Sequence, residues 1–319
     1  MIYENENELR IKADVIIDYI NTSDENLPMA VIYVRPETNE VHYEKAIILG
    51  ITPFADVVYL ANLNGKIFIK DALILEHYSL QYKFAIYGKE ELAKYPEIIT
   101  KFEDHFQTDF HNAKIIGAFD AVLKLGVSDE QLFNTMVEEK DFLRIYGQTI
   151  KKIDDYFVIN YDIPAIIRKY TPKANVFTIV ARFKKEDYSF MDINQSIFEQ
   201  IKKNNAPIIS EDRYKEKVEW NEKIKRTYHF SRNHIMAMFD MVDFVIRPNN
   251  NHIIFEETPL GRILIEKNHI SSEALLIIKD YPLIHISING EKKLVNLLEE
   301  ANNKSLEECV ELIKSIILP

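Results

Sequence analysis

Apolar and polar residues alternate over much of the stretch from residue 27 to residue 88, which is the pattern of half-buried β-strands. Asn64-Gly65 supplies the two residues that a tight hairpin turn favours. Strand-like runs cover residues 29–34, 41–49, 56–61 and 66–69. The strictest alternation follows them, at Tyr78, Leu80, Tyr82, Phe84 and Ile86. The pattern predicts an antiparallel sheet of four to six strands, with all five of these side chains in its core.

The spacing of apolar residues then changes to three and four, which predicts helices. One helix is expected over residues 92–106, with a start or a kink at Pro96. A second is expected over residues 112–125, ended by Gly126. A third begins at Ser128, where Ser-x-x-Gln forms a capping box. Residues 89–153 are therefore predicted to be helices packed on or beside the sheet.

The second half of the chain mixes the two periods. Strands are predicted at residues 156–160, 176–183 and 283–288, and a hairpin at residues 242–255. Helices are predicted at residues 164–170, 193–203 and 210–241, the last with a break near Phe230-Ser231. Two more helices start at the capping residues Thr258 and Ser305. The fold class expected is α+β, with an N-terminal antiparallel sheet and packed helices in residues 1–153 and a mixed α/β second domain in residues 154–319.

Composition and charge narrow the class of protein. No apolar run reaches the roughly 18–20 residues that cross a bilayer, so no membrane span is expected. The single cysteine, Cys309, excludes an intramolecular disulfide and a cysteine-based zinc site, and it lies on an apolar helix stripe where burial is expected. We therefore expect a soluble, cytoplasmic chain. The 29 lysines against 10 arginines suggest a bacterial origin.

All of the net charge of −11 lies in residues 1–155, which hold 16 basic and 27 acidic residues. An acidic half repels a phosphate backbone, so a nucleic-acid partner is possible but not favoured. The sequence contains no P-loop, no G-x-G-x-x-G fingerprint, no G-x-S-x-G elbow and no H-E-x-x-H motif. No nucleotide cofactor is therefore indicated, and any catalytic site would have to be dispersed along the chain.

A basic stretch within residues 164–185 is one candidate site. It contains no acidic residue and interleaves aromatic residues with Arg168, Lys169, Lys173, Arg182, Lys184 and Lys185. Such a stretch could bind an anionic ligand or an acidic partner. The alternative is that these cations pair with the acidic N-terminal half, or that they protect a strand edge.

Two sets of histidines and carboxylates are candidates for metal or acid–base chemistry. The first is His229, His234, Asp240 and Asp243. On one continuous helix the two histidines would point about 140° apart, so they could share a ligand only if the helix breaks near Ser231. The second set is Glu103, Asp104, His105, Asp109 and His111, which is equally consistent with a solvated helix end.

Because every compact catalytic motif is missing, the first expectation is a non-catalytic binding or scaffold protein that recognises a protein partner or an anionic ligand. The alternative is a metal-dependent or acid–base enzyme with a dispersed His/carboxylate site, and a second alternative is a nucleic-acid-associated protein. The identity of a cofactor and the oligomeric state stay open.

Overall fold

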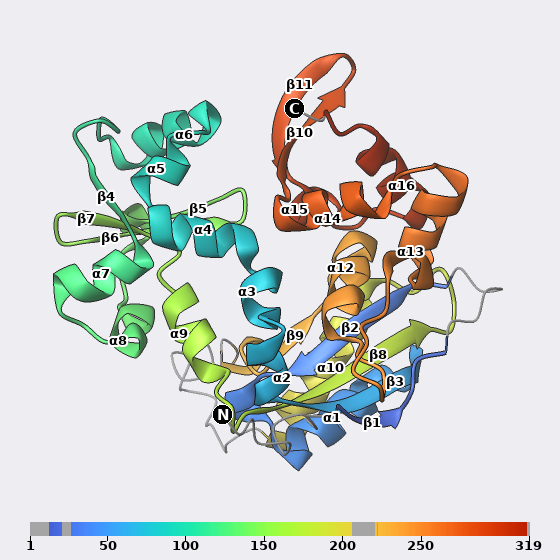
Figure 1. The fold of residues 1–319 in the computed structure, drawn as a ribbon. Coiled ribbons are helices and arrows are strands. Elements are labelled where there is room, and N and C mark those ends of the chain that lie inside the picture. The colour runs from blue at the N-terminus through green and yellow to red at the C-terminus, as the bar shows by residue number, and fades with distance from the viewer. Residues whose placement is uncertain (1–12, 21–26, 206–220, 222, 318–319) are drawn as a thin grey trace, which may run out of the picture. The chain divides into compact units, whose positions relative to one another are not determined.

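The computed structural model describes residues 13–20, 27–205, 221 and 223–317 (Figure 1). Contacts between Cα atoms group the chain into two compact units. Unit 1 takes in Met1–Leu73, Tyr170–Leu276 and Ala301–Lys314. Unit 2 takes in Ile74–Lys169, Ile277–Glu300 and Ser315–Pro319. No helix within the described ranges is both long enough and apolar enough to span a membrane.

Unit 1 is built on a five-stranded antiparallel sheet in the order β1-β3-β8-β2-β9. Its strands are β1 (Asp14–Ile17), β2 (Met29–Val34), β3 (Ala55–Asn64), β8 (Asn175–Phe183) and β9 (Tyr228–Phe230). Helix α1 (Val41–Ile51) connects β2 to β3, and α10 (Phe190–Asn205) lies between β8 and β9 in the sequence. From β2 to β9 this is the βαββαβ connectivity of the split βαβ motif, with most of unit 2 inserted between β3 and β8.

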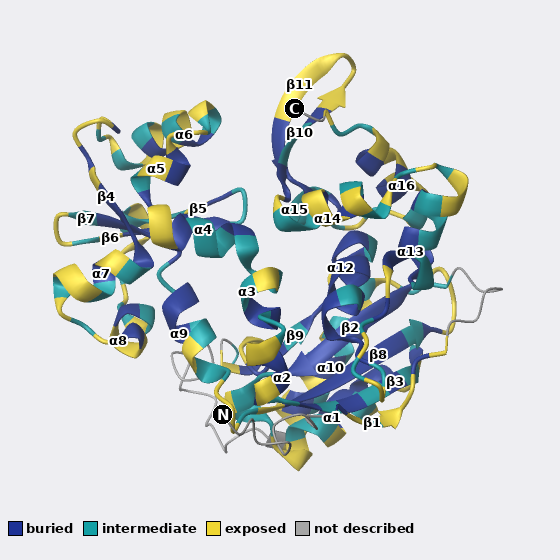
Figure 2. Cartoon of the chain, in the orientation of Figure 1, coloured by how far each residue is buried: buried dark blue, intermediate teal, exposed yellow. Residues whose placement is uncertain are grey.

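One face of the sheet packs against α1 and α10. Alternate residues of the strands, such as Ile32 and Ile179, join Ile47 of α1 and Ile197 of α10 in one buried cluster. The two helices approach closely at Gly50, where an added Cβ would lie 2.6 Å from the Cα of Ile197. The buried strands β2 and β8 appear dark blue in Figure 2.

The opposite face of the sheet packs against α2 (Gly65–Lys70) and α12 (His234–Phe244). The ring of Phe244 from α12 lies 4.8 Å from Tyr33 of β2 and 6.0 Å from Phe68 of α2. Shorter elements complete unit 1: the 3-10 helices at Pro36–Thr38 and Phe255–Glu257, α13 (Pro259–Arg262), a π-helix at Ile263–Lys267, and α16 (Leu306–Lys314).

Unit 2 contains a four-stranded mixed sheet in the order β4-β7-β6-β5, in which only β4 and β7 are parallel. Apolar residues cover both faces, because Phe157 and Val158 of β7 belong to two different buried clusters. The strands are β4 (Lys114–Gly117), β5 (Phe142–Ile145), β6 (Gln148–Ile153) and β7 (Tyr156–Ile159), and a separate hairpin pairs β10 (Leu283–Ile288) with β11 (Glu291–Asn296).

The helices of unit 2 are short. They are α4 (Ser79–Tyr87), α5 (Lys89–Leu92), α6 (Pro96–Phe106), α7 (Ala118–Leu125), α8 (Asp129–Asn134), the 3-10 helix Glu139–Asp141, α9 (Ile163–Lys169) and α15 (Leu297–Glu300). Helices α3 (Leu73–His77) and α14 (Ser272–Asp280) each contribute residues to both units.

The predicted α+β class is confirmed, and so are the local end signals. Pro96 opens α6, Ser128 forms its capping box on α8, Gly126 ends α7, Thr258 caps α13, and the Ser305 and Glu308 pair forms reciprocal hydrogen bonds at the start of α16. These signals act within three or four residues, so a sequence pattern captures them.

Three predicted strands are wrong, because residues 41–49, 66–69 and 79–87 lie in helices. In α4 the buried residues are Leu80, Phe84 and Ala85, Tyr82 is half-buried, and Ile86 is 36% exposed. Positions 80 and 84 fit a helix repeat as well as a strand repeat, so alternation alone could not decide between them.

The helices predicted over residues 89–153 are wrong in part, because residues 114–117, 142–145 and 148–153 form strands β4, β5 and β6. The hairpin predicted over residues 242–255 is reduced to one bridge between Ile246 and His252.

The predicted hairpin turn at Asn64-Gly65 is also wrong. Asn64 instead caps α2, where its side chain accepts a hydrogen bond from Lys66 N at 2.9 Å. Gly65 is needed for a close approach, because an added Cβ would lie 1.8 Å from the carbonyl oxygen of Thr171.

Part of the helix predicted over residues 210–241 lies outside the described residues. In the described part, strand β9 (Tyr228–Phe230) interrupts the helical pattern before α12 begins. The division into units also differs from the boundary predicted between residues 153 and 154. The reason is pairing across that point: β2 pairs with β8 and β9, and β3 pairs with β8.

Candidate functional site

The candidate site of unit 1 is centred on Asp240, a carboxylate buried in the middle of α12. Only 1% of Asp240 is exposed, and nine of the eleven residues of α12 are buried. Asn233 starts this helix by accepting a hydrogen bond from Met236 N at 2.9 Å. A carboxylate in such surroundings is strongly disfavoured unless hydrogen-bond donors satisfy it.

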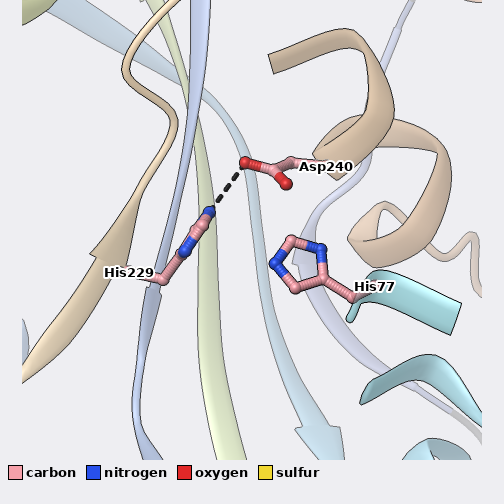
Figure 3. A group of neighbouring side chains, drawn as sticks. All are labelled: His77, His229 and Asp240. Carbon is pink, nitrogen blue, oxygen red and sulfur yellow. Dashed lines mark hydrogen bonds and ion pairs between the residues drawn. The ribbon is translucent and has the colours of Figure 1, made fainter. Parts of the chain in front are cut away.

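Two donors meet at one oxygen of Asp240. Nε2 of His229 lies 2.7 Å from Oδ2 (Figure 3). Oγ of Ser231 lies at the same distance from this oxygen. Oγ of Ser231 accepts a hydrogen bond from Val31 N at 3.0 Å, and its proton has two acceptors within reach, Oδ2 of Asp240 at 2.7 Å and Val31 O at 3.2 Å. An ionised carboxylate is only an acceptor, so an ionised Asp240 requires the proton of a neutral His229 on Nε2 and makes Nδ1 the basic nitrogen of the ring.

Strand alternation places His229 on the same face of the sheet as α12. Its neighbours Tyr228 and Phe230 belong to the core under α1 and α10, and His229 points to the opposite side. The imidazole stacks on Tyr33, with 4.6 Å between ring centroids and 12° between ring planes. The side chain is 12% exposed. Tyr33 and Asp240 therefore fix both the position and the rotation of the ring.

This arrangement suits acid–base or nucleophilic chemistry. An imidazole held by a buried carboxylate has a defined tautomer, and the carboxylate stabilises the imidazolium that forms when Nδ1 takes a proton. As metal ligands, His229 and Asp240 provide two groups within unit 1, fewer than the three protein ligands of a typical catalytic zinc site. His77, also labelled in Figure 3, is the last residue of α3 and belongs to unit 2.

His234 and Asp243, the other two members of the predicted set, have different surroundings. His234 is the first residue of α12 and contacts Phe190 edge-on, with ring centroids 5.1 Å apart. Burial lowers the pKa of His234 to about 4, against a smaller opposing effect of Glu307. Asp243 is buried one helical turn after Asp240. Among the described residues, neither belongs to a group of three histidine, cysteine or carboxylate side chains close enough to share a metal ion.

The basic stretch is divided between the units. In unit 2, Arg168 forms an ion pair with Asp129 at 2.6 Å, and Lys169 lies 5.4 Å from the ring centroid of Phe133. The partner of Arg168 is thus an acidic residue of the N-terminal half of the chain.

In unit 1, Lys184 donates to Thr52 O at 2.6 Å and lies 3.7 Å from Asp56. Lys185 lies over the ring of Tyr188. Lys173 is exposed, and Arg182 is half-buried on β8. The four residues thus have separate local surroundings.

The acidic-histidine segment at the end of α6 has a structural role. Oε1 of Glu103 accepts a hydrogen bond from Phe110 N at 2.8 Å, and Oδ1 of Asp109 accepts one from Asn112 N at 3.0 Å. The rings of His105 and His111 pack edge-on against adjacent phenylalanines. These carboxylates therefore hold the turn that leads from α6 to β4.

Sequence reasoning selected His229 and Asp240 but missed Ser231 and Tyr33. The signal for Ser231 is its place at the predicted helix break, and the signal for Tyr33 is its place in the apolar run of residues 29–34 that predicts a strand. Comparison of the chain with protein-family models, curated proteins and solved structures gives no match.

Proposed function

We propose that unit 1 carries an acid–base catalytic centre, in which His229 reacts through Nδ1 as a general base or a nucleophile and Asp240 orients it. One observation carries this proposal: the buried Oδ2 of Asp240 receives both Nε2 of His229 and Oγ of Ser231 at 2.7 Å. The proposal corresponds to the acid–base form of the enzyme alternative raised by the sequence.

The energetics favour this function over a purely structural pair. Removing a carboxylate from water costs several kcal/mol even after relaxation, and apolar residues of similar size often stabilise a core as well or better. A buried carboxylate that orients a histidine is therefore a better candidate for chemistry than for stability.

His252, in the same unit, lies outside this centre. Its Nδ1 donates to Val242 O at 3.0 Å, and its Nε2 faces Asp71 at 3.6 Å. Both ring nitrogens of His252 thus have protein partners at the surface of the fold, and Asp71 is not a buried residue. We assign His252 a structural role, which makes it a matched control for His229.

The expectation of a binding or scaffold protein, cytoplasmic and with a protein partner, stays a prediction. A binding function for an anionic ligand at the basic stretch has less support, because Arg168 and Lys184 of that stretch already have acidic partners within the chain.

The test is a search for substrate turnover with variants that separate catalysis from folding. The purified chain is incubated with a metabolite extract, and depleted and newly formed compounds are followed by mass spectrometry. We expect turnover by the parent and by His252→Gln, and a loss of about 100-fold or more in His229→Gln. Equal turnover by His229→Gln and the parent, or a compound profile unchanged by the parent, would contradict the proposal.

A further inference from the structure

One face of α12 gathers soft metal-binding groups that the acid–base centre does not use. His234, Met238 and Met241 occupy positions i, i+4 and i+7 of this helix, so they project from the same side. Together with Met29 of β2 and Pro259-Leu260 of α13, they line a cavity of about 10 Å³. This volume is that of roughly one water molecule or one metal ion.

We propose that this cavity binds a single soft monovalent cation, Cu(I), through the imidazole of His234 and the thioether sulfurs of Met238 and Met241, with Met29 as a fourth ligand. The site lies within unit 1 and shares no residue with the pair of His229 and Asp240.

The chemistry of the lining residues selects this cation. Thioether sulfur is a soft ligand that prefers Cu(I), and imidazole is an acceptable partner for copper. Within the described part of the chain no carboxylate lines the cavity, so Mg²⁺ and Ca²⁺ lack the oxygen ligands that they require. All four side chains are neutral when they bind, and a monovalent ion adds less charge to a buried site than Zn²⁺ does.

The surroundings of the ligands support the assignment. Met238 and Met241 are 1% and 0% exposed, so their sulfur atoms are shielded from water. Among the described residues, no group forms a hydrogen bond with the ring of His234, whose only ring contact there is with Phe190. The sulfur of Met29 also meets Oη of Tyr19 at 3.8 Å, so the three residues of α12 are the principal ligands.

The competing explanation is that the methionines only fill an irregular gap in the core. Methionine and leucine have similar volumes, and their exchange usually costs less than about 1.5 kcal/mol. Met→Leu substitutions therefore remove the sulfur with little change in packing. Met136, which is 90% exposed in unit 2, provides the matched control.

The experiment measures transfer of Cu(I) from bicinchoninate to the protein, without oxygen and with ascorbate present. We expect the parent, Met136→Leu and Cys309→Ala to withdraw one Cu(I) per chain, and the double variant Met238→Leu, Met241→Leu to bind at least 100-fold more weakly. Failure of the parent to withdraw Cu(I), equal binding by the double variant, or loss of binding in Cys309→Ala would overturn the proposal.

A second measurement keeps the test decisive if the double variant fails to fold. The methionine methyl groups of the parent are labelled with ¹³C, and Ag(I) is added as a diamagnetic analogue of Cu(I). We expect the signals of Met238, Met241 and Met29 to shift with a stoichiometry of one, while that of Met136 stays in place. Unchanged signals for Met238 and Met241 would overturn the proposal.

Discussion

Replacing Phe84 and Ile86 with alanine, one at a time, tests whether residues 79–87 form a helix or the strand that their alternation suggests. Phe84 is fully buried in α4, its ring centroid lies 5.8 Å from that of Tyr95, and it packs in the same cluster as Phe102. Ile86 is 36% exposed. A buried Phe→Ala change typically costs about 3–5 kcal/mol, because it removes burial and leaves a cavity.

For Ile86→Ala we expect a smaller cost of about 1–2 kcal/mol, because about a third of that residue already contacts water. In a strand both side chains would lie on one buried face, and the two costs would be similar. Urea unfolding gives the free energies, and hydrogen exchange of peptides from residues 74–106 shows whether the loss is local to unit 2. Equal destabilisation by the two substitutions would refute the helical assignment.

Three further predictions concern burial. Burial raises the pKa of the Cys309 thiol to about 12. A disulfide reagent should therefore modify Cys309 only after urea is added, and rapid labelling of Cys309 in the folded protein would contradict this. The pKa of His234 is about 4 when folded and 6.5 otherwise, so the unfolded chain takes the proton first. The metal-free parent should therefore lose up to roughly 3 kcal/mol of stability as the pH falls from 6.5 to 4, with a smaller loss in His234→Gln, measured by urea unfolding. Gly65→Ala should lower the melting temperature more than Gly126→Ala, because its Cβ would meet Thr171 O whereas Gly126 borders open space.

The helix-capping signals in this sequence predict the observed helix ends, whereas the apolar patterns of residues 41–49, 66–69 and 79–87 predict strands where the chain forms helices. Ser128 and Thr258 are cap residues whose partners lie three positions away, so the sequence contains the whole interaction. For residues 41–51 the deciding contacts come from α10, which is about 150 positions further along the chain. Tertiary packing therefore overrides the strand preference of a segment rich in β-branched residues.

The candidate site was predictable in part. The expected break near Phe230-Ser231 separates His229 from α12, and strand alternation sets the face on which His229 lies. The sequence could not show that His229 and Ser231 meet at one oxygen of Asp240, because this depends on how α12 packs on β2 and β9. It also grouped His234 with His229, although the two rings lie in different surroundings.

The central claim is that Asp240 holds His229 with its proton on Nε2 and its lone pair on Nδ1. The most direct test is long-range ¹H–¹⁵N correlation NMR of the parent and of Asp240→Ala at a pH where the imidazole is neutral, since the two tautomers give different ¹⁵N shifts. We expect a single Nε2–H tautomer for His229 in the parent and a mixture of tautomers in Asp240→Ala. A proton on Nδ1 in the parent, or the same tautomer in both proteins, would contradict it.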